Sequence, residues 1–249
     1  MPDLFSLFLF FYSFLPFLIY SFTKKFIWFE IFALIAVLLH GIYLFGYEII
    51  YLLLITYVIS TIAELVSLKT PLYCFGVKYR YNLKHKFFSS RINLLGVYPL
   101  EITFAWVLIK YAAFCLGILI SSAFSLSKFL EILLIPLILV SVDFIIDPVA
   151  VNIDKLWKWE KGTKYFGIPW QNFLGWYLVG LASTLVFNYF GITKSVNFNY
   201  LFILPVVFYA GVIKNFPQLF KQNRQLAIIG SLPAFMWVVL SAISLIKLT

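Results

Sequence analysis

The sequence predicts an all-α integral membrane protein, a single domain of residues 1–249 folded as a polytopic bundle of about eight spanning helices, with both termini outside. Hydrophobic residues make up 63% of the chain and charged residues 12%, which is more apolar surface than a soluble domain can bury. Apolar runs recur along the whole chain, and basic residues gather in alternate connections between them. No internal repeat or Pro/Gly/Ser-rich linker divides the chain.

The apolar runs are judged against the ~30 Å of hydrocarbon that a helix crosses at ~1.5 Å per residue. The first run follows Asp3 rather than a basic segment and lacks a small-residue cleavage site, so we interpret it as a span and not a removable signal. The seventh run is the shortest and contains Pro205. The predicted spans are residues 4–22, 26–45, 49–68, 94–121, 129–149, 172–190, 198–213 and 226–246.

The basic residues test this map independently, because Lys and Arg are retained in cytoplasmic loops. With the N-terminus outside, the outer side keeps only Lys128, Lys194 and Lys247, and Lys110 lies within a span. The inner connections hold the others: Lys24, Lys25, Lys69, Lys78, Arg80, Lys84, Lys86, Arg91, Lys155, Lys158, Lys161, Lys164, Lys214, Lys221 and Arg224. The net charge of +9 therefore reflects membrane topology, and no nucleic-acid partner is expected.

Two inner loops are long and differ in character. Residues 69–93 form a basic, Tyr-rich cytoplasmic loop suited to anionic lipid headgroups. Residues 152–171 alternate Lys with aromatic residues, which predicts an interfacial aromatic loop with its rings in the acyl boundary. The aromatic content of the chain, 21%, suggests a large apolar or polyene ligand, although lipid-facing helices with aromatic belts would have a similar composition.

Charged groups inside a span cost at least ~2.5 kcal/mol each, so each one requires an explanation. Glu131 lies at the outer lip of its predicted span beside Lys128, so we treat it as interfacial. The other acidic side chains within the predicted spans all fall in the cytoplasmic halves of their helices; they are Glu30, Glu64, Glu101, Asp143 and Asp147. Glu30 can pair with Lys24 and Lys25. Lys110 can snorkel or pair with Glu48.

Asp143 and Asp147 form the sharpest of these signals. At positions i and i+4 they share one helix face, and two carboxylates so close in a low dielectric do not both ionise, so one should hold a proton. Pro148 should end or kink the span, placing both acids at a helix break that can line a cavity. A simple acidic helix end beneath a basic surface is the competing interpretation.

Several chemistries lack the residues they need. Two histidines, His40 and His85, cannot build the histidine boxes of a di-iron desaturase, and Cys74 and Cys115 suggest neither a disulfide framework nor a metal cluster. The Asp-x-x-x-Asp pattern occurs once, whereas membrane prenyltransferases carry two Asp-rich motifs that bind Mg²⁺ and diphosphate. We therefore predict no metal site.

The segment from Asp143 to Trp176 combines Asp-x-x-x-Asp-Pro-x-Ala, a Trp-x-Trp pair and Tyr-x-Gly-x-Pro-x-x-Asn-x-x-Gly-Trp. The positions that carry this pattern are Asp143, Asp147, Pro148, Ala150, Trp157, Trp159, Tyr165, Gly167, Pro169, Asn172, Gly175 and Trp176. The pattern resembles the signature of the carotenoid biosynthesis membrane protein family, which includes carotenoid 1,2-hydratases and bisanhydrobacterioruberin hydratase. Glu64, followed by Phe75-Gly76, Tyr79 and Tyr81, is similar to the family's upstream acid and aromatic region.

The resemblance implies a cofactor-independent hydro-lyase in the cell membrane, with its site toward the cytoplasm, that adds water to the terminal double bond of an acyclic carotenoid. Its expected partners are the polyene, membrane lipids and other carotenoid-pathway enzymes. We expect Asp143, Asp147 and Glu64 to be catalytic. The expected substrate-binding residues are Trp157, Trp159, Tyr165, Asn172, Trp176 and Glu101.

Two other functions remain open on the sequence. An isoprenoid prenyltransferase or cyclase also needs acids and aromatic rings that stabilise a cation, and dependence on Mg²⁺ and a diphosphate would identify it. A proton-coupled transporter also uses buried carboxyl groups, but transporters usually contain repeated halves, which this chain does not show.

Overall fold

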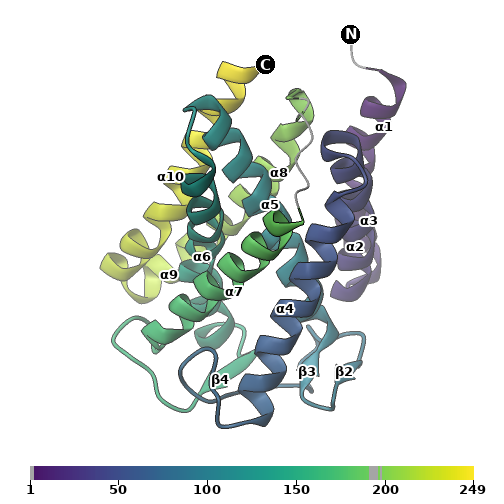
Figure 1. Cartoon of the computed structure of the whole chain (residues 1–249). Helices are drawn as coiled ribbons and strands as arrows, with labels where there is room; N and C mark the ends of the chain where they lie inside the picture. Colours follow the sequence, from purple (N-terminus) through teal and green to yellow (C-terminus); the bar gives the residue numbers. More distant parts are fainter. Residues whose placement is uncertain (1–2, 191–195, 197) are drawn as a thin grey trace.

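The structure, a computed structural model, describes residues 3–190, 196 and 198–249 and confirms the all-α prediction (Figure 1). Its α-helices are α1 (Leu4–Tyr12), α2 (Leu15–Thr23), α3 (Phe26–Phe45), α4 (Ile49–Lys69), α5 (Leu100–Ala123), α6 (Lys128–Asn152), α7 (Trp170–Tyr189), α8 (Ile203–Ala210), α9 (Phe216–Gln222) and α10 (Arg224–Leu248). Two 3₁₀ turns are η1 (Tyr200–Phe202) and η2 (Gly211–Asn215), and four short strands are β1 (Tyr79–Tyr81), β2 (Asn93–Leu94), β3 (Tyr98–Pro99) and β4 (Trp157–Trp159). The predicted outer-side Lys194 lies outside the described residues.

Seven helical segments of the described chain are long and apolar enough to cross a membrane. Five are single helices, whereas Leu4–Thr23 comprises α1 and α2, and Tyr200–Gln222 runs from η1 to α9. The remaining predicted span, residues 172–190, forms the 20-residue helix α7 but is not among the seven. Polar residues at both ends of α7, including Asn172 and Asn188, lower its hydropathy, so its place in the bundle rests on packing.

Two predicted helix ends are wrong for reasons that involve proline. The span predicted from residue 94 begins at Leu100, because residues 93–99 form the antiparallel β2–β3 hairpin and Pro99 is the extended N-cap of α5. Pro disfavours a helical residue before it. In α6, Pro148 does not end the helix at Asp147, since α6 continues to Asn152. Pro148 does lack the N–H that would bond to the carbonyl of Phe144, and the hydroxyl of Tyr165 donates to that carbonyl instead, at 2.6 Å.

Helices α4 to α7 form a ring around the functional region. Helix α4 contacts α5 and α7, and α6 contacts the same two helices. Glycines permit the close approaches, since a Cβ on Gly117 of α5 would lie 2.5 Å from a side-chain atom of Ile135 in α6, and one on Gly180 of α7 would lie 2.7 Å from Leu139. Small residues at membrane helix interfaces have this effect in general. The remaining helices pack around this ring.

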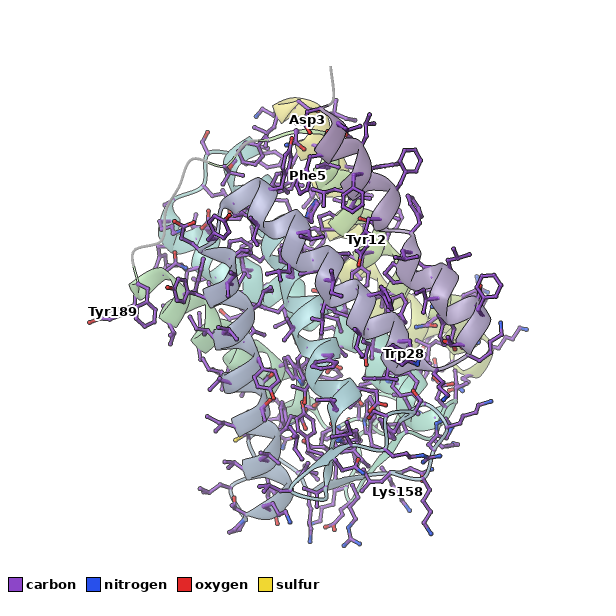
Figure 2. All side chains as sticks on the ribbon, turned by 90° about the vertical axis from the view of Figure 1, so that its right-hand side faces the viewer. Asp3, Phe5, Tyr12, Trp28, Lys158 and Tyr189 are labelled. Carbon is purple, nitrogen blue, oxygen red and sulfur yellow. The ribbon has the colours of Figure 1, made fainter. Side chains whose placement is uncertain are left out.

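The two long inner loops join at one end of the ring. Strands β1 and β4 pair antiparallel, with Tyr79 opposite Trp159 and Tyr81 opposite Trp157, and Figure 1 shows β4 beneath the helix ends. Exposed Glu160 forms ion pairs with Lys78 at 3.6 Å and Arg80 at 3.5 Å. In Figure 2, Lys158 lies at this end and Asp3 at the opposite end of the molecule, so the loop end is the basic end.

Other buried polar groups differ from expectation. Lys110 makes hydrogen bonds with the carbonyl of Gly180 at 2.8 Å and Thr184 Oγ1 at 2.5 Å, so it ties α5 to α7 and is not paired with Glu48. Glu30 is buried, and the ion pairs among the described residues do not include a pair with Lys24 or Lys25. Cys74 and Cys115 are free thiols, as expected.

Candidate functional site

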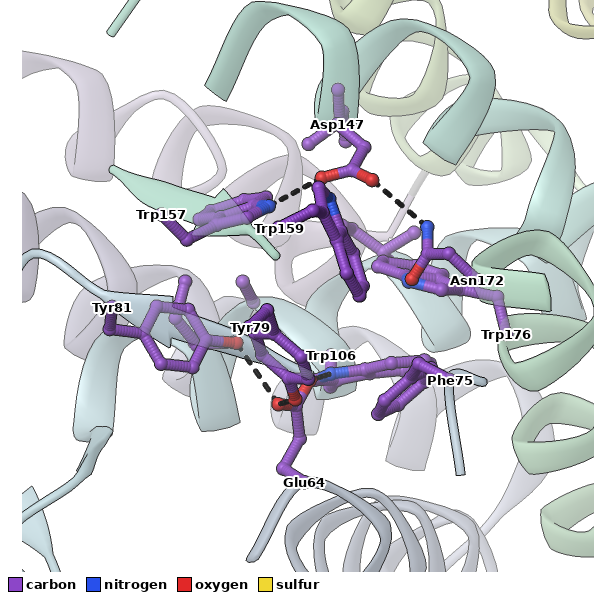
Figure 3. Close-up of a pocket in the computed structure, with 14 residues that line it drawn as sticks. Glu64, Phe75, Tyr79, Tyr81, Trp106, Asp147, Trp157, Trp159, Asn172 and Trp176 are labelled. Atoms are coloured by element: carbon purple, nitrogen blue, oxygen red, sulfur yellow. Dashed lines mark hydrogen bonds between the residues drawn. The ribbon is translucent and has the colours of Figure 1, made fainter. Parts of the chain in front are cut away.

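A cavity of about 60 Å³ lies inside the helix ring, next to the β1–β4 pair (Figure 3). At about 10–15 Å³ for each water-sized group, this volume holds the tip of a branched chain and not a whole polyene. The residues that line it are Glu64, Phe75, Tyr79, Tyr81, Ile102, Ala105, Trp106, Ile109, Ile146, Asp147, Trp157, Trp159, Asn172 and Trp176. They come from α4, α5, α6, α7, β1, β4 and the loop before β1.

Glu64 forms one wall of the cavity, near the end of α4. Its Oε1 accepts the indole N–H of Trp106 at 3.1 Å. Its Oε2 accepts the hydroxyl of Tyr81 at 3.0 Å and that of Tyr79. Burial, and then the charge of Glu64, raises the pKa of both tyrosines well above the usual range, so they remain protonated donors. Three hydrogen-bond donors therefore hold this carboxyl group in one position.

Asp147 forms the opposite wall, as Figure 3 shows. Its Oδ1 accepts the indole N–H of Trp157 at 2.5 Å, and its Oδ2 accepts the side-chain amide of Asn172 at 3.0 Å. The indole nitrogen of Trp159 also lies near Asp147, but it has no hydrogen bond of normal geometry.

Asp143 lies behind Asp147 and does not line the cavity. The amide nitrogen of Asn172 donates to Asp143 Oδ2 at 2.6 Å as well as to Asp147, which its two N–H groups permit. The other oxygen of Asp143 is buried and has no hydrogen-bond partner among the residues that the structure describes. A buried carboxylate with an unpartnered oxygen is costly, and a like charge one helical turn away adds to that cost. The arrangement therefore favours one proton shared by the two aspartates.

Aromatic rings fill the space between the two walls. Trp106 and Trp176 are stacked, with their ring centroids 3.9 Å apart. Tyr79 lies 4.7 Å from Trp159, and Tyr81 lies 5.7 Å from Trp157, between ring centroids. The rings of both β4 tryptophans thus contribute to the cavity wall. Faces of such rings attract a cation within about 6 Å.

The structure brings together most, but not all, of the predicted site residues. Glu64, Asp147, Trp157, Trp159, Asn172 and Trp176 line the cavity. Tyr165 does not line it, because its hydroxyl is bonded to the carbonyl of Phe144 on α6. Glu101 lies in the first turn of α5, where its Oε1 accepts the backbone N–H of Ser90 at 2.6 Å. Tyr165 positions α6, and Glu101 belongs to a separate polar cluster.

Four of the aromatic residues that line the cavity are not among the predicted site residues. Phe75, Tyr79 and Tyr81 belong to the family resemblance without a predicted role, and Trp106 has no place in that resemblance. A signal for Trp106 was present, since tryptophan is enriched at membrane interfaces and this one falls in the middle of a predicted span. Its burial with an indole N–H requires an acceptor, which Glu64 supplies.

The site combines two acid groups on opposite walls with aromatic rings between them. This arrangement can donate a proton to a bound molecule from one side and accept a proton on the other. Among the described residues, the His, Cys, Asp and Glu side chains do not form a group of three that could hold a metal ion. Two carboxyl groups that face each other across an apolar cavity are the groups that general acid–base chemistry requires.

Comparisons with known proteins give a family assignment. The family model described as "Carotenoid biosynthesis protein" matches residues 26–242, which is most of the chain. Over 48 residues the chain is 42% identical to a protein named bisanhydrobacterioruberin hydratase from Haloarcula japonica. That alignment covers 19% of this chain and 16% of the relative. No solved structure matches the chain.

Proposed function

Because the chain belongs to the carotenoid biosynthesis protein family, we propose that it hydrates the terminal C1=C2 double bond of acyclic carotenoid end groups. The observation that carries this proposal is the placement of Asp147 and Glu64 on opposite walls of an aromatic cavity. The name of the Haloarcula relative supports a hydratase. The seven apolar segments support a reaction in a membrane, where such a substrate dissolves.

The first step is proton transfer to carbon. The proton shared by Asp143 and Asp147 is delivered from Asp147, since only that carboxyl group reaches the cavity. The alkene π electrons form the new C–H bond at the less substituted carbon, C2, and leave a tertiary cation at C1. Asn172 holds the two aspartates together, so that Asp143 stabilises the proton before transfer and Asp147 becomes the carboxylate afterwards.

Aromatic rings stabilise the cation in the second stage. Trp106, Trp157, Trp159 and Trp176 line the cavity between the acids, and a ring face in a dry site contributes up to about 2 kcal/mol. The fixed carboxylates add electrostatic stabilisation without reorganising. The cation therefore persists long enough for water to add to it before the cation loses a proton.

Water captures the cation in the last step. Its oxygen forms the C–O bond at C1 while one of its protons passes to the carboxylate of Glu64, which Tyr79, Tyr81 and Trp106 hold in position. The product is a tertiary alcohol, and one water is consumed for each end group. The exchange involves no oxidation or reduction, so no cofactor enters the proposal.

The substrate would reach the site with only its tip inside the cavity. The rest of the polyene, comparable in length to the ~30 Å hydrocarbon core, would lie in the bilayer. The cavity adjoins the basic loop end that contains Lys158, and basic loops are retained in the cytoplasm. We therefore place the reaction on the cytoplasmic side.

The test is expression in a bacterium that accumulates lycopene, followed by mass analysis of the extracted pigments. One added water for each hydrated end is expected. A parallel strain supplied with bisanhydrobacterioruberin, the compound in the relative's name, tests a longer substrate. Unchanged pigments in both strains, with the protein present in their membranes, would refute the hydratase. The positive control is the Asp154→Asn variant, which should keep the wild-type activity because Asp154 is exposed.

A further inference from the structure

A side chain from the loop between α6 and α7 closes the proline break in α6. Pro148 has no N–H for the carbonyl of Phe144, and the hydroxyl of Tyr165 donates to that carbonyl at 2.6 Å. Phe144 directly follows Asp143 in the chain, and Pro148 directly follows Asp147. The Tyr165 hydroxyl is therefore attached to the turn of α6 that carries both aspartates.

The ring of Tyr165 also connects α6 to α7. Its centroid lies 5.8 Å from that of Phe144 and 5.6 Å from that of Phe173 on α7, and it meets both rings nearly at right angles. The rings of Phe144 and Phe173 stack, with their centroids 4.3 Å apart. Phe173 directly follows Asn172, whose amide bonds to both aspartates. Tyr165 therefore contacts the two helices between which those hydrogen bonds are made.

Gly230 of α10 leaves the space that the Tyr165 hydroxyl occupies. A Cβ on this glycine would lie 1.9 Å from the hydroxyl oxygen of Tyr165 and 3.0 Å from the carbonyl oxygen of Phe144. Gly230 is buried, and α10 packs against α6. Non-bonded atoms do not pack as closely as the first of these distances. A methyl group at this position would therefore displace the hydroxyl and break its bond to α6.

We propose that Tyr165 and Gly230 are positioning residues that set the hydrogen bonds between Asn172 and the aspartate pair. In catalysis, a role that rests on the proposed function, they hold the shared proton where Asp147 delivers it into the cavity. Neither residue lines the cavity, so both act through the pair and not through the substrate. A displaced Tyr165 ring moves the packed faces of α6 and α7, and with them the two ends of the Asn172 hydrogen bonds.

The first measurement needs no carotenoid. Infrared spectroscopy of the purified full-length protein follows the C=O band of the protonated aspartate pair, which is assigned by its loss in the Asp143→Asn, Asp147→Asn double variant. Asn172→Ala shows in which direction the band moves when the amide is removed. Tyr165→Phe and Gly230→Ala should move the band in that same direction. Each should also lower kcat for hydration about tenfold, equivalent to about 1.4 kcal/mol in barrier height, with KM unchanged.

Two matched variants separate positioning from a general loss of packing. Tyr209→Phe also removes a buried hydroxyl that donates to a carbonyl of α6, that of Ile138, at 2.7 Å. Gly41→Ala also adds a methyl group at a buried helix contact, 2.8 Å from a side-chain atom of Ile49. Both variants should lower the melting temperature, but they lie away from the Asn172 hydrogen bonds and should leave the band and kcat as in the wild type.

A double variant tests whether Tyr165 and Gly230 act on each other. Without the hydroxyl, the nearest atoms to a Cβ at Gly230 are the carbonyl oxygen of Phe144 at 3.0 Å and the ring carbon Cζ of Tyr165 at 3.1 Å, which small shifts relieve. Gly230→Ala combined with Tyr165→Phe should therefore resemble Tyr165→Phe alone in band position and kcat. A kcat reduced by the product of the two separate losses would overturn the proposal for Gly230.

The outcomes separate this positioning role from the hydratase. A band in Tyr165→Phe that matches the band in Tyr209→Phe would overturn the positioning role, as would a wild type in which no band belongs to the aspartate pair. If Gly230→Ala fails to fold, Tyr165→Phe carries the same expectation. A shifted band in a protein that hydrates no carotenoid would support the positioning role and refute the hydratase. Hydration with an unchanged band and kcat in Tyr165→Phe would do the reverse.

Discussion

Asn172 determines which carboxyl groups act together. Its amide nitrogen bonds to Asp143 and Asp147 at 2.6 and 3.0 Å, which links two acids of α6 from a neighbouring helix. Only Asp147 lines the cavity. The two aspartates are equivalent as an i, i+4 pair in sequence, but we propose different roles for them: Asp147 touches the substrate and Asp143 positions its proton.

Substitution of the aspartates should show this difference. Asp147→Asn removes the acid in the cavity and should lower the hydration rate by about 10²–10⁴-fold, the usual contribution of a general acid. Asp143→Asn leaves the cavity acid in place and should lower the rate less. The measurement is the rate of alcohol formation in membranes with matched protein levels. Full activity in Asp147→Asn would remove that residue from the mechanism.

Glu64 offers a second test at the scale of a single side chain. Glu64→Gln keeps the size of the side chain but cannot accept the proton from water, so hydration should fall by about 10²-fold or more. Tyr81→Phe removes one of three donors and should have a smaller effect. The measurement is again the rate of alcohol formation in membranes. If Glu64→Gln forms the alcohol at the wild-type rate, a different group is the base.

The β1–β4 pair is the element that completes the site. Its six residues join two loops that are separated in the sequence by helices α5 and α6, and they supply Tyr79, Tyr81, Trp157 and Trp159 to the cavity. An isolated two-stranded pair is marginal in water. Packing of its rings against the helix ring and the bonds to Glu64 and Asp147 therefore hold it in register.

Cross-linking tests this register directly. Arg80 lies opposite Lys158, and opposite Cα atoms in an antiparallel pair are about 4.5–5.5 Å apart, within the range of about 4.4–6.8 Å that a disulfide spans. In a Cys74→Ser background, Arg80→Cys with Lys158→Cys should form a disulfide on mild oxidation, seen as a shift in gel mobility that reductant reverses.

The control for the cross-link is Arg80→Cys combined with Lys164→Cys. Lys164 follows β4 by several residues and should not form the bond at a comparable rate. Equal cross-linking of both pairs would show that the two loops are not held in the register that the structure describes.

At the scale of the whole molecule, the polar groups are distributed unevenly. The cavity and the β1–β4 pair lie toward the end marked by Lys158 in Figure 2, and Asp3 marks the other end. Large apolar side chains are exposed on the outer helices, for example Phe11 and Phe17 near the N-terminus and Leu232 and Ile243 on α10. This pattern suits a protein surrounded by lipid.

Labelling of single cysteines tests the orientation. We propose that the basic loops face the cytoplasm, where Lys and Arg are retained. In intact cells of a Cys74→Ser background, a membrane-impermeant thiol reagent should then label Lys128→Cys but not Lys158→Cys. Opening the cells should expose Lys158→Cys as well. Labelling of Lys158→Cys alone in intact cells would reverse the topology and place the cavity on the outer side.

The sequence by itself determined the membrane class, most of the spans, the family resemblance and the identity of the main acids. These follow from local signals. A chain in lipid must form its backbone hydrogen bonds within each helix, and a charge inside a span has a free-energy cost that makes such residues rare. The predicted start of α5 is wrong because residues 94–99 are as apolar as the helix that follows. Their turn and the extended backbone at Pro99 delay the helix to Leu100.

Only the tertiary structure decided which groups meet. Glu64 faces Asp147, Trp106 donates to Glu64, and β1 pairs with β4, all through contacts between residues far apart in sequence. Glu101 and Tyr165, which the sequence predicts to bind substrate, lie outside the cavity. Packing among helices fixes these distances, because glycines such as Gly117 and Gly180 set how closely neighbouring helices approach. Hydropathy reports that a side chain is inside the membrane, but only packing determines what it faces.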